Sequence, residues 1–324
     1  EVIRVGRAFG VFKLKGQTMD FSLPRKDNTT GAGHRDFEVQ CDPDLSFEEA
    51  SRRRDLRINS MGYDPMNHKL LDPHGGLSDI REGRLSATDP VHFGEDPLRA
   101  LRVMQFAARF RLNVAPDLLK LMSVCDLNSL PGERIWGEFE KFLMQGKKPS
   151  LGLKALLDSG LVSYFPELEA LVGLEQAQDE HPEGDAWTHT LITLDVASAS
   201  NPPKTDRLIL MFAALTHDFG KQMLPSGQTR DPDGEIHTAA GAKLAESFLE
   251  RMMAPRVLIK QVSTLVREQH SPENLVTNAS PDPAYHQLAR RLDRGRTDMN
   301  LLAMLAWADR VGRGGELAYE MARE

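Results

Sequence analysis

The segment from Glu95 to Phe110 restricts the possible folds of this chain more than any other. Its acidic start suits the positive end of a helix dipole, and Pro97 fits a first helical position. Apolar residues then recur at three- and four-residue steps, at Leu98, Leu101, Met104 and Ala108. The sequence therefore predicts a helix that packs one face on a core and keeps a polar end.

Asp96 and Arg99 are expected to share one face of this helix, because residues three apart are neighbours on a helical surface. A carboxylate and a guanidinium placed together can offer acceptors and forked donors to the edge of a nucleobase. The competing interpretation is an ordinary surface ion pair, which the spacing alone favours.

Length and composition indicate a globular protein of more than one unit. A chain of 324 residues is long for a single core. Its net charge of −7 argues against indiscriminate nucleic-acid binding but leaves room for a local basic groove. Two cysteines are too few for a disulfide framework, and neither a signal segment nor a long apolar run is visible. We therefore expect a cytoplasmic protein with no membrane partner.

Residues 2–21 alternate between short apolar runs and glycine-marked turns, which is typical of strands in a small sheet. Asp20 lies on the last of these strands. Two-metal nucleotidyl transfer uses carboxylates on adjacent strands, although an isolated strand-end aspartate is usually only a turn former. The sequence also predicts a polar loop from Asn28 to His34 and a structural turn at Asp42-Pro43-Asp44.

A helix from Phe47 to Tyr63 is predicted next, with Ser46 and Glu49 forming a capping box. It carries three consecutive arginines, residues 52–54. Three arginines in a row spread around a helix, so at least one should point into the protein or a ligand, although a solvated face is the simpler interpretation. The stretch Asp72–Asp79 is expected to be a turn that leads into a short element.

From Leu151 onward the pattern becomes fully helical, and a second, all-α unit is expected to begin there. Several histidines and aspartates of this unit fall at helix faces or helix ends, namely His189, His217, Asp218, His237, His270 and Asp309. One buried histidine is usually an ordinary core residue, but a group of this size favours a metal centre. Imidazole and carboxylate ligands suit Mn, Fe, Ni, Co or Mg better than structural zinc.

Four strings in the first half resemble motifs of class II tRNA nucleotidyltransferases, which are the CCA-adding enzymes and the bacterial poly(A) polymerases. They are VGRAFGVFKLKG, MDFSLPRKD, RRDLRIN and EDPLRALRVMQFAARF. The resemblance implies Mg²⁺-dependent nucleotidyl transfer with Asp20 as a catalytic carboxylate. It implies nucleotide binding by Arg54, Asp55, Asn59, Asp96, Arg99 and Arg102, and phosphate or RNA contacts by Arg25, Lys26 and Arg53. Asp96 and Arg99 would act as the protein template for CTP and ATP.

The second half resembles the HD superfamily of metal-dependent phosphohydrolases through its H…HD…D pattern. The resemblance implies that His189, His217, Asp218 and Asp309 bind Ni²⁺, Mn²⁺, Co²⁺ or Mg²⁺. It also implies that His237 and His270 bind a second metal or phosphate, and that Lys221 contacts phosphate.

The sequence departs from the first family at two places. Leu56 and Arg57 differ from the family's R-R-D-F-T-I-N string, and no Gly-Gly loop or D-x-D strand precedes Val5. We therefore expect the N-terminal part of the catalytic head to be missing. On this view residues 1–324 alone bind tRNA and hydrolyse small phosphoesters without adding CMP or AMP.

The two resemblances together predict an α+β chain, with part of a nucleotidyltransferase head at 1–80, a helical neck and template domain at 81–150, and a helical body with an HD domain at 151–324. Their order matches a bacterial CCA-adding enzyme that also hydrolyses 2′,3′-cyclic phosphates and 2′-phosphates. The partners implied are tRNA, CTP and ATP, and the oligomeric state stays open. The A-adding and poly(A) relatives, a chain active only as a hydrolase, and a non-catalytic tRNA-binding module are the alternatives.

Overall fold

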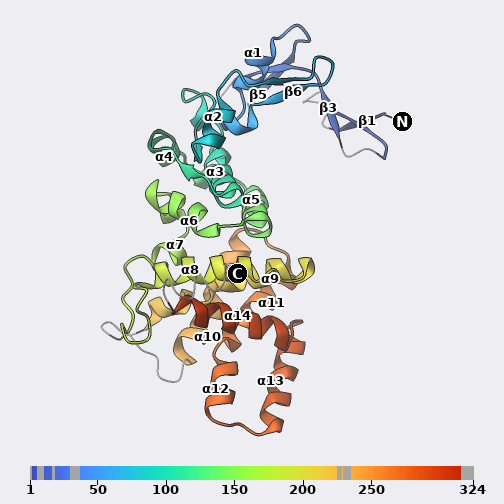
Figure 1. The fold of residues 1–324 in the computed structure, drawn as a ribbon. Helices are drawn as coiled ribbons and strands as arrows, with labels where there is room; N and C mark the ends of the chain where they lie inside the picture. Colours follow the sequence, from blue (N-terminus) through green and yellow to red (C-terminus); the bar gives the residue numbers. More distant parts are fainter. Residues whose placement is uncertain are drawn as a thin grey trace. The chain divides into compact units, whose positions relative to one another are not determined.

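The computed structural model describes residues 2–5, 11–16, 19–29, 37–224, 228 and 235–314. The chain forms two compact units. The first holds residues 1–99 and 113–125, and the second holds residues 100–112 and 126–324. Small sheets lie in the first unit and helices make up the second, so the predicted α+β class is confirmed (Figure 1).

The first unit begins with two small antiparallel sheets. Strands β1 (Val2–Val5), β2 (Val11–Leu14) and β3 (Asp20–Ser22) form the first, and β4 (Arg25–Thr29) pairs with β5 (Phe37–Cys41) in the second. The strands predicted within residues 2–21 are confirmed, and Asp20 opens β3 opposite Lys13. The loop predicted from residue 28 was placed too early, because residues 28 and 29 pair with β5. Residues 30–36 lie outside the described part.

Helix α1 (Phe47–Arg52) has the predicted capping box, with Ser46 accepting from the Glu49 N–H. The predicted extension of this helix to Tyr63 is wrong. The helix ends at Arg52, because the carboxylate of Asp55 accepts the Leu56 N–H and the buried Leu56 bridges to Ala87 in an extended conformation. The short elements that follow are η2 (Arg57–Asn59), β6 (Gly62–Asp64) and β7 (Lys69–Leu71).

The predicted turn at residues 72–79 leads into helix α2 (Gly76–Arg81). Asp72 accepts the N–H groups of Gly76 and Leu77, and Gly75 adopts φ 81° just before the helix. The rest of the unit consists of β8 (Arg84–Leu85), η3 (Phe93–Glu95), β9 (Asn113–Val114) and α4 (Pro116–Ser123). The strands β8 and β9 pair in parallel.

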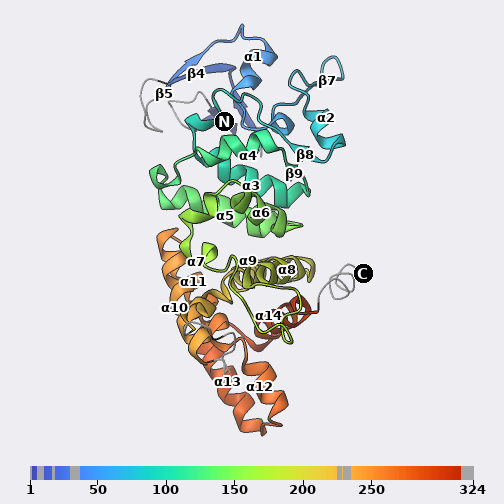
Figure 2. The same ribbon diagram turned by 90° about the vertical axis from the view of Figure 1, so that its left-hand side faces the viewer.

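The second unit is helical throughout its described residues, as predicted for the region after Leu151. Its helices are the part of α3 (Leu98–Phe110) from Ala100 onward, α5 (Gly132–Gln145), α6 (Pro149–Asp158), α7 (Pro166–Glu169), α8 (Ala186–Ala199), α9 (Lys204–Thr216), α10 (Glu235–Arg251), α11 (Arg256–Glu268), α12 (Ser271–Thr277), α13 (Asp282–Arg294) and α14 (Met299–Gly312). Short 3₁₀ turns lie at η4 (Leu127–Ser129), η5 (Leu161–Tyr164) and η6 (Phe219–Met223). Helices α12 and α13 form a hairpin at one end of this unit (Figure 2).

Helices α8 and α9 form the centre of the second unit. The segment from Ile209 to Thr216 is completely buried, so α9 ends inside the protein rather than at its surface. Helix α14 approaches α8 closely, since a Cβ on Gly312 would meet the hydroxyl oxygen of Thr193 and the ring of His189. This packing brings polar residues of three helices into one buried place. No described helix has both the length and the apolar character needed to cross a bilayer.

Candidate functional site

His217 and Asp218 come directly after α9, where the buried helix stops. The ring nitrogen Nδ1 of His217 lies 2.8 Å from the carbonyl oxygen of Ala214. A carbonyl oxygen can only accept, so Nδ1 carries a proton, and Nε2 is the nitrogen whose lone pair is available when the ring is neutral. This Nε2 is buried and makes no hydrogen bond to any described residue.

His189 on α8 and Asp309 on α14 face the same place. The Nε2 atom of His189 lies 2.8 Å from Asp309 Oδ1 and 3.9 Å from Asp218 Oδ2. The Nε2 atom of His217 lies 3.3 Å from Asp218 Oδ2 and 3.8 Å from Asp309 Oδ1. The structure thus brings together four side chains that the sequence separates by up to 120 residues.

The carboxyl groups of this cluster stay ionised although they are buried. Burial alone would raise the pKa of Asp218, but the charges of His217 and Lys221 hold that pKa well below its ordinary value. Burial also opposes ionisation of Asp309, yet its hydrogen bond with His189 and the charge of Arg313 hold its pKa well below the ordinary value. For His189, burial would lower the pKa, but the carboxylates of Asp309, Glu183 and Asp218 overcome burial and raise the pKa of the imidazole.

Two cationic side chains lie against these carboxylates. Lys221 Nζ is 2.9 Å from Asp218 Oδ2 and also donates to the side-chain oxygen of Gln176. Arg313 donates from Nη2 to Asp309 Oδ2 at 2.6 Å. The predicted phosphate residue Lys221 is therefore beside the cluster, where its charge balances Asp218.

The donor set fits a divalent metal ion. Ligand atoms of His189, His217 and Asp218 lie within 4.8 Å of one another, and Asp309 adds an oxygen next to His189. A buried imidazole lone pair without a hydrogen-bond donor is a costly feature that a metal ion would satisfy. Mixed nitrogen and oxygen ligands suit Mn, Fe, Ni, Co or Mg.

The other two predicted histidines form a pair. His237 on α10 and His270, which precedes α12, place their Nε2 atoms 2.8 Å apart. Burial lowers the pKa of His270 to about 4, so this ring is neutral near pH 7.

The nucleobase-template residues lie at the start of α3. Asp96 was predicted on a helix face shared with Arg99, and this prediction is wrong. Helix α3 starts at Leu98, and Asp96 lies before it in an extended conformation, because its carboxylate accepts the Leu98 N–H at 3.2 Å. The guanidinium of Arg99 donates to the carbonyl oxygens of His92, at 2.7 Å, and Arg53, at 3.0 Å. Both template residues therefore contact backbone groups, Asp96 in its own turn and Arg99 also in the distant segment that carries Arg53.

Arg102 lies further along α3. Its guanidinium is 3.9 Å from Glu138 Oε1 and covers the ring of Phe106 at 5.3 Å. Glu138 is buried and pairs with Lys141 at 2.8 Å. Glu138 lies on α5 and contacts Arg102 on α3, so α5 supports the helix that follows the template residues.

Asp55 and Asn59 form a local hydrogen bond of 3.0 Å, and Asp55 is buried. Of the three consecutive arginines, Arg53 is half-buried while Arg52 and Arg54 are exposed. Asp20, Arg25 and Lys26 lie on described strands, but their side chains are outside the described part.

Family models match three parts of the chain. Residues 6–86 match the poly(A) polymerase head domain, residues 117–171 match the probable RNA and SrmB-binding site of polymerase A, and residues 186–311 match the HD domain. The multifunctional CCA protein of Xanthomonas campestris pv. campestris strain B100 is 33% identical over 332 residues, which cover 99% of this chain and 79% of that protein. The chain belongs to the multifunctional CCA protein family.

Another member, from Nitrosospira multiformis, is 35% identical over 271 residues, which cover 82% of this chain and 63% of that protein. Solved CCA-adding enzymes share the fold. A complex with ATP has a TM-score of 0.58 at 16% identity and covers 100% of this chain and 66% of its own. The Thermotoga maritima enzyme in complex with tRNA has a TM-score of 0.52 at 16% identity and covers 92% and 68%. Both the nucleotidyltransferase and the HD families are metal-dependent.

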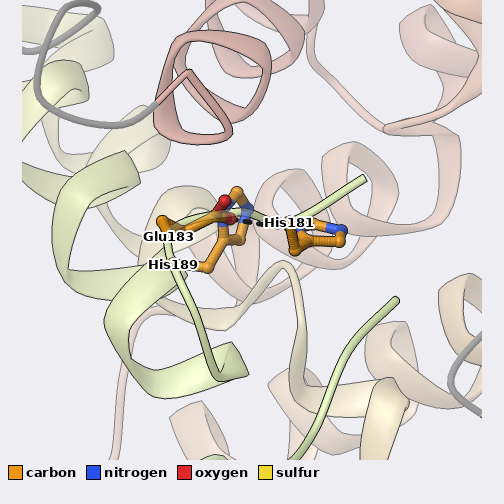
Figure 3. A group of neighbouring side chains, drawn as sticks. All are labelled: His181, Glu183 and His189. Atoms are coloured by element: carbon orange, nitrogen blue, oxygen red, sulfur yellow. Dashed lines mark hydrogen bonds and ion pairs between the residues drawn. The ribbon is translucent and has the colours of Figure 1, made fainter. Parts of the chain in front are cut away.

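Two residues beside the HD cluster were missed by sequence reasoning, namely His181 and Glu183. One carboxylate oxygen of Glu183 contacts the rings of both His181 and His189. Its Oε1 atom lies 2.8 Å from His181 Nδ1 and 2.6 Å from His189 Nδ1 (Figure 3). These two residues precede the HD-domain match, which begins at residue 186. The signal in the sequence is the string His181-Pro182-Glu183 in the polar loop just before α8.

Proposed function

We propose that this chain works in the maturation of tRNA 3′ ends, with CTP and ATP as nucleotide substrates and with a second, hydrolytic site in its HD domain. Membership of the multifunctional CCA protein family supports the first activity. The single observation that carries the second is the buried Nε2 lone pair of His217, which faces two ionised carboxylates and has no hydrogen-bond partner among the described residues.

At the HD site, His189 and His217 would supply nitrogen ligands and Asp218 and Asp309 would supply oxygen ligands. A divalent ion bound there provides a Lewis acid for a phosphoryl oxygen and lowers the pKa of a bound water. The burial of all four side chains holds them in place before the ion binds. Mn²⁺, Ni²⁺, Co²⁺ and Mg²⁺ all suit this donor set.

The proposed substrates are small phosphoesters, namely 2′,3′-cyclic phosphates and 2′-phosphates such as those on damaged tRNA ends. Lys221 offers its ammonium group to a phosphate beside the cluster, since it already lies 2.9 Å from Asp218. The pair His237 and His270 adds two imidazole groups, that of His270 being neutral, for the phosphate or for a second ion.

For nucleotidyl transfer, we assign nucleobase selection to Asp96 and Arg99 and nucleotide contacts to Arg54, Asp55, Asn59 and Arg102. The carbonyl contacts of Arg99 support this assignment, because they hold its guanidinium at the start of α3. Asp20 is proposed as a Mg²⁺-binding carboxylate, and Arg25, Lys26 and Arg53 as phosphate or RNA contacts. We divide the chain into a head at 1–80, a neck at 81–150 and a body at 151–324.

The hydrolytic site is tested with the Asp218→Ala variant. Removing one ligand leaves the ion short of its shell, so bound Mn²⁺ and hydrolysis of a 2′,3′-cyclic nucleotide should both fall to background. The matched control is Asp293→Ala, which removes an exposed aspartate from α13 and should leave both unchanged. Full metal content and full activity in the Asp218→Ala protein would contradict the assignment.

A further inference from the structure

Glu183 contacts the edge of His189 that faces away from the metal ligands. Its Oε1 atom is 2.6 Å from His189 Nδ1, whereas Asp309 lies 2.8 Å from the opposite ring nitrogen, Nε2. The side chain of Glu183 is 1% exposed, and that of His189 is 0% exposed. A single buried imidazole therefore lies between two carboxylates that approach its two nitrogens.

We propose that Glu183, supported by His181, is a positioning residue that orients His189 as a ligand of the HD-domain metal. The inference rests on the metal centre proposed above. Ionised carboxylates face both nitrogens of His189, and because Glu183 lies at Nδ1, the proton that stays on the ring when a metal ion binds at Nε2 is the one on Nδ1. Nε2 faces Asp309, with which it forms a hydrogen bond, and Asp218, so an ion that takes the place of the Nε2 proton would lie between His189 and both carboxylates.

The Nδ1 atoms of the two ligand histidines face different partners. His217 donates its Nδ1–H to the carbonyl oxygen of Ala214, which is neutral. His189 Nδ1 faces the carboxylate of Glu183 at 2.6 Å, and the negative charge behind the ring makes its Nε2 a stronger ligand for a cation. The structure thus gives Nδ1 of His189 a charged partner, whereas the partner of His217 Nδ1 is a neutral carbonyl group.

Glu183 is itself held from several directions. His181 donates from Nδ1 to the same Oε1 at 2.8 Å and packs edge-on against His189, with ring centroids 4.9 Å apart. The loop that carries both residues is anchored by Asp185, which accepts the N–H groups of Gly173 at 2.7 Å and Thr188 at 2.9 Å. The loop can therefore hold the carboxylate in register with the first turn of α8, where His189 lies.

Mn²⁺ affinity, measured by calorimetry on the full chain at constant pH, tests the proposal. Glu183→Gln keeps the size of the side chain and removes its charge, and we expect the Kd for Mn²⁺ to rise about 10- to 100-fold. The control Glu175→Gln removes one charge from an exposed position in the same loop and should leave the Kd unchanged. The metal-free Tm of both variants should stay within a few degrees of the unmodified protein, which separates positioning from a structural role.

The histidine tautomer gives a second readout. In 15N-histidine spectra of the Zn²⁺-loaded protein, His189 should carry its proton on Nδ1, and Glu183→Gln should weaken that preference because the amide can also donate to Nδ1. If Glu183→Gln does not fold, His181→Gln decides, with a rise in Kd expected again.

The outcomes separate this inference from the metal centre itself. An unchanged Kd in Glu183→Gln, or a proton on Nε2 in the Zn²⁺-loaded protein, would overturn the role of Glu183. An unchanged Kd in Asp218→Ala would instead overturn the proposed centre.

Discussion

Asp195 on α8 accepts two hydrogen bonds from Ser150 at the start of α6. Its Oδ1 atom receives the Ser150 N–H at 2.8 Å, and its Oδ2 atom receives the Ser150 hydroxyl at 2.6 Å. The carboxyl group thereby satisfies an N–H at the first turn of another helix, 45 residues away. It joins α6 to the same helix that carries His189.

This contact predicts a pH dependence of stability. Burial raises the pKa of Asp195 in the folded protein, and the hydrogen bonds from Ser150 only partly offset it. The folded state then binds a proton at Asp195 more readily than the unfolded state does. The stability that this proton contributes is fully present below the ordinary pKa of 3.8 and is lost as pH rises through the pKa of Asp195 in the folded protein. Asp195→Asn should remove this loss, so its free energy of unfolding relative to the unmodified protein should increase as pH rises above 4. Urea titrations at several pH values measure it, and a difference that stays constant with pH would contradict the prediction.

The close packing behind Asp218 depends on Gly220. A Cβ at this position would overlap the carbonyl oxygen of His237 and lie 2.6 Å from the Gly241 nitrogen. Gly220→Ala should therefore lower the free energy of unfolding by at least about 3 kcal/mol and weaken metal binding. Gly137→Ala is the matched control, since nothing lies within 4 Å of a Cβ there, and it should stabilise α5 by about 0.5–1 kcal/mol. Chemical unfolding of both variants measures the sign of each effect. Similar stabilities of the two variants would show that the close backbone contact at Gly220 does not require a glycine.

Arg207 on α9 holds the ends of two other helices. Its guanidinium donates to the carbonyl oxygens of Met144, Gly146 and Ser198 and to the Ser198 hydroxyl, at 2.8–3.1 Å. Arg207→Lys keeps the charge but removes the planar guanidinium with its several N–H donors. Several of the acceptors then lose their donor, so the free energy of unfolding should fall by about 2–3 kcal/mol. Thermal and urea unfolding measure the change. A lysine variant as stable as the unmodified protein would show that charge alone is sufficient.

Arg99 gives a prediction about nucleotide choice. In a form of the protein that incorporates CMP and AMP into tRNA, Arg99→Ala should weaken discrimination among nucleotides by about 1–3 kcal/mol, the value of a good bidentate base contact. The exposed Arg54 offers a comparison, since Arg54→Ala should weaken the binding of all four nucleotides by the same factor. Competition between CTP, ATP, GTP and UTP measures the preference. An unchanged preference in a folded Arg99→Ala protein would remove the template assignment.

Local patterns in the sequence correctly predicted much of the fold. The capping box at Ser46 and Glu49, the turn before α2 and the helical second unit follow from hydrogen bonds and periodicities within a few residues. The position of His217 and Asp218 at the end of a buried helix was also visible, because an apolar run of helical length precedes them.

Predictions failed where a side chain competes locally with the helix. The α1 prediction ran past Arg52 because apolar spacing continues beyond it, whereas Asp55 bonds to the Leu56 N–H and Leu56 pairs with a distant segment. Asp96 was placed on the face of α3 for a similar reason, although its carboxylate caps the Leu98 N–H from outside the helix. Spacing shows where a helix can run, but hydrogen bonds with flanking residues decide where it begins and ends.

The sequence by itself determined which residue types could bind a metal and on which helices most of them lie. Only the tertiary structure decided how they meet. It placed Asp309 against His189 across 120 residues, left Nε2 of His217 without a donor and put Glu183 behind His189. Distances and tautomers of this kind depend on how α8, α9 and α14 pack, and packing is a property of the whole core that no local pattern encodes.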